Sequence, residues 1–260
     1  MKSTAKTIAC AVFALTLTGC ATQPPADGQA VADPIEPFNR AMYQVHDVLD
    51  QAVIRPAAWT YKNVLPGQVQ YYVHSFLTNL GEPIVFLNNV LQGDGERAFN
   101  TFMRFTLNST FGLAGMLDFA GEAGFEAEPE DFGQTLAVWG VDDGPFLFLP
   151  LIGPTNARDL TGRVVDSFLD PFNHIARAHD AEGFLYGRPI AAGIDRRARL
   201  MPTYDDMRAS SVDFYATLRS AYAQNRAAQI RNQAAGDMLP DYNFDMPDAD
   251  DATPATPPTN

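Results

Sequence analysis

The first twenty residues constrain this chain more than any other segment, because they decide its export and the chemistry left after processing. Lys2 and Lys6 precede an apolar run over residues 8–17, and Leu17-Thr18-Gly19-Cys20 follows. Small residues directly before a cysteine are typical of a lipoprotein signal, with lipid attached to Cys20. The apolar run is about half as long as a helix that crosses a bilayer, so we expect it to be cleaved off. An ordinary secretory signal is the less favoured alternative.

Both cysteines of the chain lie in this segment, so the mature protein is expected to carry no free thiol. Cys10 leaves with the signal and Cys20 takes the lipid, which excludes a disulfide and a cysteine metal site. Removing residues 1–19 takes away two lysines and no acid, so the formal net charge changes from −13 to −15. Because Lys and Arg are not clustered, nucleic acid is a poor partner, and contact with lipid should be mainly apolar.

One folded domain is expected between two polar ends. Residues 1–19 are the signal, and residues 20–32, which are small, polar and contain prolines, form a lipidated tether. Ala21 rather than Asp follows the cysteine, which favours the periplasmic face of the outer membrane. Residues 236–260 are acidic and end in a Pro and Thr tract, which predicts a disordered tail. Residues 33–235 remain for a single domain.

Helical periodicity dominates this domain. Apolar residues recur at spacings of three and four along residues 35–51 and 69–80, which predicts two amphipathic helices. Asp33 is a candidate N-cap of the first, with Glu36 as the acid of a capping box. Further helices are expected over residues 157–168, 171–178 and 191–200. A last one is expected from a capping box at residues 203–206 to about residue 232, with its charged face solvated.

Two short segments, residues 83–92 and 96–111, have apolar side chains on more than one side. Such helices are either buried centrally or partly exposed to lipid. At about 1.5 Å per residue they reach only about 15 to 24 Å, less than the hydrocarbon core of about 30 Å, so they could lie in one leaflet but not span it. Their asparagines are candidates for a polar lining, although helix capping or buried hydrogen bonding explains them equally well: Asn88, Asn89, Asn100 and Asn108.

Residues 132–154 are expected to form an irregular hairpin. The turn signal Asp143-Gly144-Pro145 separates two apolar arms, residues 136–141 and 146–152. A tip this apolar is costly in water unless it packs or touches lipid. A buried loop that closes the core is the alternative.

Catalytic signatures are missing from the sequence, which predicts that the protein is not an enzyme. No Gly-x-Ser-x-Gly elbow occurs, and Ser109 and Ser167 lack a local signature. The four histidines are scattered at spacings that do not suit a zinc helix. Phosphate-binding and dinucleotide motifs are absent, so neither a cofactor nor a metal is expected. A phospholipase would need a nucleophile and a base brought together by folding.

Several longer motifs together resemble the MlaA (VacJ) family of outer-membrane, phospholipid-binding lipoproteins. The resemblance extends over about residues 33–230. It rests on DPIEPFNRAMYQVHDVLD at 33–50, RPAA at 55–58, EPIVFLNNVLQGD at 82–94, RFTLNSTFGLAGMLD at 104–118 and FGQTLAVWGVDDGPFLFLPLIGPTNARD at 132–159. Any one of these motifs alone would be a weak signal, and together they are specific.

The resemblance implies a mainly all-α, ring-like disk of short amphipathic helices, sunk in the inner leaflet, with a central amphipathic channel. Phospholipids misplaced in the outer leaflet would pass through it to a soluble, MlaC-like periplasmic carrier, and a trimeric porin would be a partner. A scaffold lipoprotein that links the membrane to periplasmic partners is the alternative. The hairpin would gate the channel, with the candidates Trp139, Gly140, Asp143, Gly144, Pro145, Phe146, Phe148 and Pro150.

Overall fold

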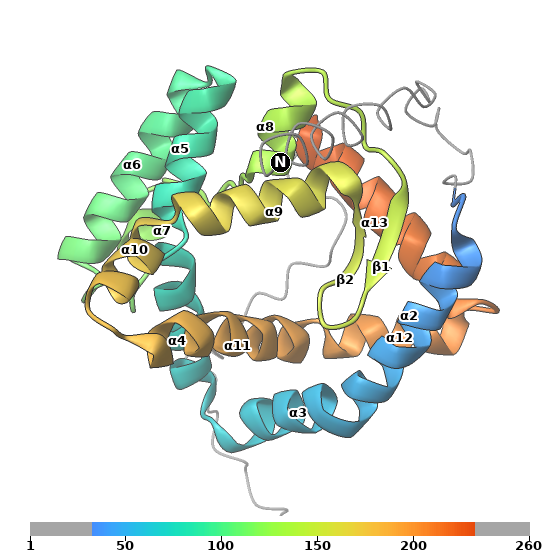
Figure 1. The fold of residues 1–260 in the computed structure, drawn as a ribbon. Coiled ribbons are helices and arrows are strands. Elements are labelled where there is room, and N and C mark those ends of the chain that lie inside the picture. Colours follow the sequence, from blue (N-terminus) through green and yellow to red (C-terminus); the bar gives the residue numbers. More distant parts are fainter. Residues whose placement is uncertain (1–32, 232–260) are drawn as a thin grey trace, which may run out of the picture.

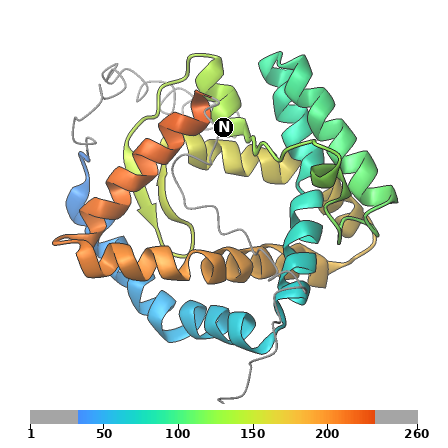
Figure 2. The same ribbon diagram turned by 180° about the vertical axis from the view of Figure 1, so that it is seen from behind.

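The computed structural model describes residues 33–231, which form a ring of helices with one two-stranded hairpin. Figures 1 and 2 show this ring from opposite sides. Its first part consists of α2 (Glu36–Leu49), the π-helical turn η1 (Asp50–Ile54), α3 (Arg55–Val64), α4 (Gly67–Asn79), α5 (Glu82–Gln92), α6 (Gly95–Thr110) and α7 (Phe119–Glu122). The rest consists of α8 (Phe132–Val138), β1 (Phe146–Leu149), β2 (Gly153–Asn156), α9 (Ala157–Leu169), α10 (Pro171–Ala178), α11 (Glu182–Arg199), α12 (Met201–Ser210) and α13 (Phe214–Ile230).

The predicted all-α class and ring-like arrangement are confirmed by this architecture. The signal, the tether with Cys20 and the acidic tail lie outside the described residues. Their assignments therefore stay predictions.

The start of α2 differs from the predicted capping box. Ile35 is the N-cap, and no side chain caps the helix. The carboxylate of Asp33 instead accepts hydrogen bonds from Asn39 Nδ2 at 2.8 Å, from Arg219 Nη1 at 3.1 Å and from the Tyr215 hydroxyl. The capping prediction was wrong because partners on α13, far away in the sequence, occupy this carboxylate.

The hairpin forms farther along the chain than predicted: the second predicted arm supplies its first strand. Residues 136–141 are not a strand, because Asp131 caps α8 by accepting from Gln134 N at 2.9 Å and most of this segment is helical. The strands are β1 and β2, paired antiparallel, with the turn at residues 150–152 rather than at residues 143–145. Buried Asn39 of α2 bonds the outer edge of β1 through Phe146 O and Phe148 N, both at 2.9 Å. The hairpin is thus fixed to α2 along one edge.

The predicted last helix is two helices. Met201 begins α12, two residues before the expected capping box, and Ser210 ends it. Asp213 caps α13 by accepting from Ala216 N at 3.2 Å. The charged face of α13 is not solvated as expected, since Arg226 is buried and holds carboxylates of other elements. Packing across the ring sets these boundaries, which local periodicity does not report.

Two small apolar clusters stabilise the ring wall. The larger contains Phe146, Phe148, Tyr215 and Leu218, with aromatic neighbours from α2 and α12. The smaller joins α3 to α11 and α12 through Ala58, Ala198 and Met201. The helices α8 and α9 approach so closely that a Cβ on Gly162 would lie 2.3 Å from Gly133 N. Only glycine permits this approach.

Buried ion pairs contribute much of the remaining cohesion. Arg104 of α6 donates through Nε to Glu82 of α5 at 2.9 Å and through Nη2 to Asp118 at 3.1 Å. Arg226 of α13 binds Asp131 at 2.6 Å and Asp159 at 2.9 Å, tying α13 to α8 and α9. A ring has less interior than a globule, so its wall relies on polar networks that join neighbouring helices.

Candidate functional site

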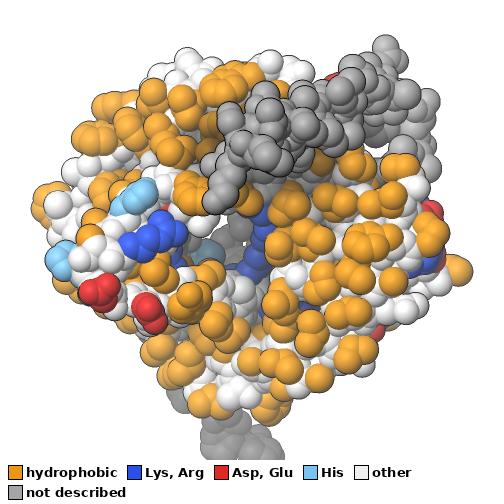
Figure 3. All heavy atoms as spheres, viewed as in Figure 1, with side chains coloured by type: hydrophobic (Ala, Val, Ile, Leu, Met, Phe, Trp, Pro, Cys, Tyr) orange, Lys and Arg blue, Asp and Glu red, His pale blue; other side chains and the backbone are white. Residues whose placement is uncertain are grey.

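The central opening of the ring is the candidate site. Figures 1 and 2 show α9 and α11 on opposite sides of this opening, with the β1–β2 hairpin along a third side. Figure 3, in the orientation of Figure 1, shows a hollow at the same place, with Lys or Arg side chains on its wall. On this face, the opening is a hollow with positively charged side chains, and many apolar side chains surround it.

Helix geometry indicates which side chain of α11 enters the opening. Ala198 is buried in the cluster that joins α11 to α3. Helix α3 lies farther from the opening than α11, so Ala198 faces away from the opening. Arg196 precedes Ala198 by two residues, about 200° around the helix, so it faces the opposite way. Its side chain is exposed to solvent. We therefore assign Arg196 to the wall of the opening.

Arg163 of α9 is its counterpart across the opening. Partial burial lowers the pKa of the Arg196 guanidinium, although the residue is still accessible to solvent, and the positive charge of Arg163 lowers this pKa further. Because α9 and α11 lie on opposite sides of the opening, this effect of Arg163 on Arg196 indicates that both side chains extend toward it. Arg163 is also exposed to solvent. The sequence did not single out either residue. Net charge and the lack of Lys and Arg clusters along the chain do not reveal two arginines that only folding brings together.

Other polar groups on these helices are already occupied. Arg197 of α11 binds both oxygens of Asp50 at 2.8 Å. Asp195 accepts from the Tyr61 hydroxyl at 2.9 Å and lies 2.8 Å from His74 Nδ1. Burial acts to raise the pKa of Asp195, but the hydrogen bond with His74 and the nearby charge of Arg199 outweigh it, so this pKa is lowered. This network is structural, because it joins α3, α4 and α11.

The predicted polar lining falls mainly inside the wall. Asn88 donates to Asp166 Oδ1 at 2.9 Å and accepts from Thr135 Oγ1 at 2.9 Å. Asn89 donates to Thr101 Oγ1 at 3.1 Å, and Asn108 donates to Asp118 Oδ1 at 2.9 Å and accepts from Ala120 N at 2.8 Å. All three are buried, as in the alternative of buried hydrogen bonding. Asn100, which is half-buried, donates to Glu126 O at 2.8 Å. A lining role stays a prediction.

The gating candidates are spread over four different settings. Trp139 and Gly140 end α8, where the indole donates to Leu91 O at 3.1 Å. Asp143, Gly144 and Pro145 lie in the link to β1, and Asp143 forms an ion pair with Arg158. Phe146 and Phe148 point into the core. Among the candidates, Pro150 alone belongs to the turn of the observed hairpin.

The exposed tip of that turn consists of residues the sequence analysis did not select. Leu151 and Ile152 are 68% and 43% exposed. Leu151 has a left-handed backbone with φ of 69°, and its N–H donates to His46 Nδ1 of α2 at 3.2 Å. Burial lowers the pKa of His46, which favours the neutral ring that accepts this bond. The tip is therefore apolar and tethered to α2 by a titratable group.

The outer surface of the ring carries many exposed apolar side chains. Figure 3 shows them over much of one face. They include Val48, Trp59, Val64, Phe99, Phe102, Phe111, Leu113, Phe168, Ile175, Tyr186 and Ile190. Extended apolar surface of this kind marks contact with a membrane or another protein. Along residues 33–231, none of the helices combines the length and apolar content needed to cross a membrane.

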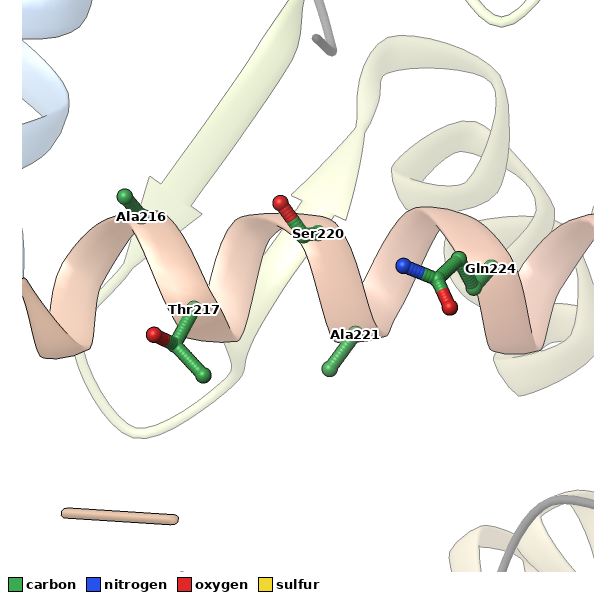
Figure 4. Close-up of a pocket in the computed structure, with 5 residues that line it drawn as sticks. All are labelled: Ala216, Thr217, Ser220, Ala221 and Gln224. Carbon is green, nitrogen blue, oxygen red and sulfur yellow. The ribbon is translucent and has the colours of Figure 1, made fainter. Parts of the chain in front are cut away.

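Two further depressions lie away from the opening. Figure 4 shows one on α13, formed by Ala216, Thr217, Ser220, Ala221 and Gln224, whose side chains all leave a single helix and do not converge. The other lies beside α6, and four of its nine lining residues are acidic. In residues 33–231 no group of three or more His, Cys, Asp and Glu side chains is arranged to hold a metal ion. The opening remains the most distinctive site.

The fold and the site define a class: an all-α ring with an apolar exterior and an arginine-bearing central opening. Residues 31–229 match the family model described as MlaA lipoprotein. The chain belongs to the MlaA lipoprotein family.

Individual relatives agree with this membership. The chain is 36% identical over 202 residues to an uncharacterized protein of Rickettsia felis, covering 77% of this chain and 79% of the relative. It is 36% identical over 236 residues to the intermembrane phospholipid transport system lipoprotein MlaA of Haemophilus influenzae, covering 87% and 91%. A solved structure described as the structural basis for maintenance of bacterial outer membrane lipid asymmetry superposes with a TM-score of 0.67 at 31% identity, covering 78% of this chain and all of that one.

Proposed function

We propose that this protein is an outer-membrane lipoprotein that removes phospholipids misplaced in the outer leaflet and so maintains lipid asymmetry. The observation that carries the proposal is the ring itself, which combines an apolar exterior with a charged central opening. A phospholipid headgroup is costly to move through hydrocarbon, whereas its acyl chains are not. A ring set in one leaflet would give the headgroup a polar route while the chains stay in an apolar environment.

The apolar exterior supports embedding in the inner leaflet. Exposed aromatic and aliphatic side chains occur on most helices, including Trp59 on α3, Phe102 on α6 and Phe168 on α9. Burying each of them in hydrocarbon is favourable by about 25 cal/mol per Å² of apolar surface. Lipid on Cys20 would then mainly sort and orient a domain that already partitions into the leaflet on the periplasmic side.

The partners belong to the same proposal. Lipid that leaves the opening needs a soluble carrier to cross the periplasm, so an MlaC-like carrier is the proposed recipient. A trimeric porin is the proposed neighbour in the membrane, and the hairpin with its apolar tip at Leu151 and Ile152 is the proposed gate. No covalent bond is made or broken in this scheme.

Deletion of the gene from its own organism tests the proposal. We expect the amount of surface-exposed phospholipid to rise, to return to normal with the wild-type gene, and to stay high with Cys20→Ala. An unchanged lipid asymmetry after deletion contradicts the transport function. Weakened attachment of periplasmic proteins without a lipid change would instead support the scaffold alternative.

A further inference from the structure

We propose that Arg163 and Arg196 form a phosphate subsite inside the central opening, which holds the phosphodiester of a phospholipid headgroup. This assignment rests on the proposed function and names the residues that would recognise the transported molecule. It also qualifies the expectation from net charge, since a strongly acidic chain can still present a local cationic pair.

The two arginines face each other from opposite sides of the ring. Arg163 lies on α9 and Arg196 on α11, and both views show the opening between these helices. Both side chains are exposed to solvent. They are close enough to each other that the positive charge of Arg163 lowers the pKa of Arg196. An anion between them would contact two guanidinium groups at once.

Unlike most arginines of the described chain, these two lack a carboxylate partner. Within residues 33–231, ion pairs hold Arg40, Arg55, Arg97, Arg104, Arg158, Arg188, Arg197, Arg199, Arg208, Arg219 and Arg226. No ion pair or hydrogen bond in that part of the chain holds Arg163 or Arg196. The positive charge of Arg163 helps to lower the pKa of Asp131. Both carboxylate oxygens of Asp131, however, bind Arg226, at 2.6 and 2.8 Å.

Electrostatics favour an anion at this place. Two like charges in a partly desolvated opening repel each other more strongly than they would in bulk water. The lowered pKa of Arg196 reflects this unfavourable setting. A phosphodiester neutralises the repulsion, and planar guanidinium groups suit its oxygens as bidentate donors.

Space and polarity around the pair fit a lipid better than a free phosphate. Gly193 lies one turn before Arg196 on the same face of α11, and a Cβ built there meets nothing within 4 Å. Val164 of α9, which follows Arg163 directly in the sequence, is apolar and 50% exposed. A ligand that places its phosphate at the arginines can therefore lay an acyl chain against α9.

Binding to the purified, lipidated protein in dodecyl maltoside tests the subsite. The probes are dihexanoyl-phosphatidylglycerol, dihexanoylglycerol, which lacks the phosphate, and glycerol phosphate, which lacks the acyl chains. The variant is Arg163→Gln/Arg196→Gln. Arg177→Gln on α10 is the matched control, because Arg177 is also exposed and has no carboxylate partner in the described residues.

We expect the double variant to lose at least about tenfold in affinity for dihexanoyl-phosphatidylglycerol, since each arginine would contribute charged hydrogen bonds. Its binding of dihexanoylglycerol and its melting temperature should match wild type, as should the lipid affinity of the Arg177→Gln control. A double variant within twofold of wild type overturns the subsite. Glycerol phosphate that binds as tightly as the lipid also overturns it, in favour of a free phosphate site. Because binding is measured on the isolated protein, this result is independent of the deletion experiment.

Discussion

Replacing Phe148 with alanine should destabilise the ring by about 4 kcal/mol, within the range for fully buried Phe→Ala changes. The Phe148 side chain is 0% exposed and lies in the main apolar cluster. Its ring meets those of Tyr43 and His46 edge-on, with centroids 5.5 and 5.4 Å away, and such pairs add about 0.5 to 1.5 kcal/mol each. The loss would be about a third of the stability of a typical domain.

Thermal unfolding followed by circular dichroism measures this loss, with Leu151→Ala as the control from the same hairpin. A domain of this size melts about 2 to 4 °C lower per kcal/mol, so we expect a decrease of about 8 to 16 °C for Phe148→Ala. Leu151 is 68% exposed at the tip, and its variant should melt within about 2 °C of wild type. If Phe148→Ala is equally harmless, the residue is not a core residue and our account of the hairpin fails.

Three further changes probe the wall. Arg226→Met should cost about 3 to 5 kcal/mol in urea unfolding, because it leaves two carboxylates of α8 and α9 without their cation, and a loss under 1 kcal/mol would contradict this. Gly162→Ala should lower the melting temperature sharply, since its Cβ would lie 2.3 Å from Gly133 N, and a normal melting curve would disprove the close approach. The lowered pKa of His46 means that the folded state binds this proton less readily than the unfolded chain, so unfolding free energy should fall as pH drops from about 6.5 through the folded pKa. His46→Gln should reduce that dependence, and an identical pH profile would refute it.

The sequence predicts a helix well where one of its faces is apolar. It predicts the ends of a helix less well where contacts with distant residues set them. The spacing of apolar residues predicts α2, and the Pro171 start predicts α10. The capping boxes at Asp33 and Thr203 satisfy the local pattern, yet neither caps a helix in the structure. Asp33 is occupied by α13, and α12 begins before Thr203. Such competition between local and distant partners is invisible in a short window of sequence.

The candidate site was predictable only in outline. Short helices with apolar residues on more than one side predict a position in one leaflet, and the family resemblance implies the ring. The wall of the ring depends on which side chains meet after folding. Asn88 and Asn89 are polar residues in apolar helices, and they proved to be hydrogen-bonded interior groups. Arg163 and Arg196 are 33 positions apart in sequence, and each resembles an ordinary surface arginine. Only the closure of the ring brings them to one opening.

Obstructing the opening tests the central claim most directly. Gly193→Trp adds a large side chain on the face of α11 that carries Arg196, at a position with open space around the Cβ. Gly187→Trp is the matched control, because Gly187 has the same open surroundings but lies about 180° around α11 from Arg196. Each variant replaces the chromosomal gene, and surface-exposed phospholipid is measured at equal protein level. The account predicts that Gly193→Trp raises surface phospholipid to the level of the deletion while Gly187→Trp does not. Normal asymmetry with Gly193→Trp would show that lipid does not pass through the ring.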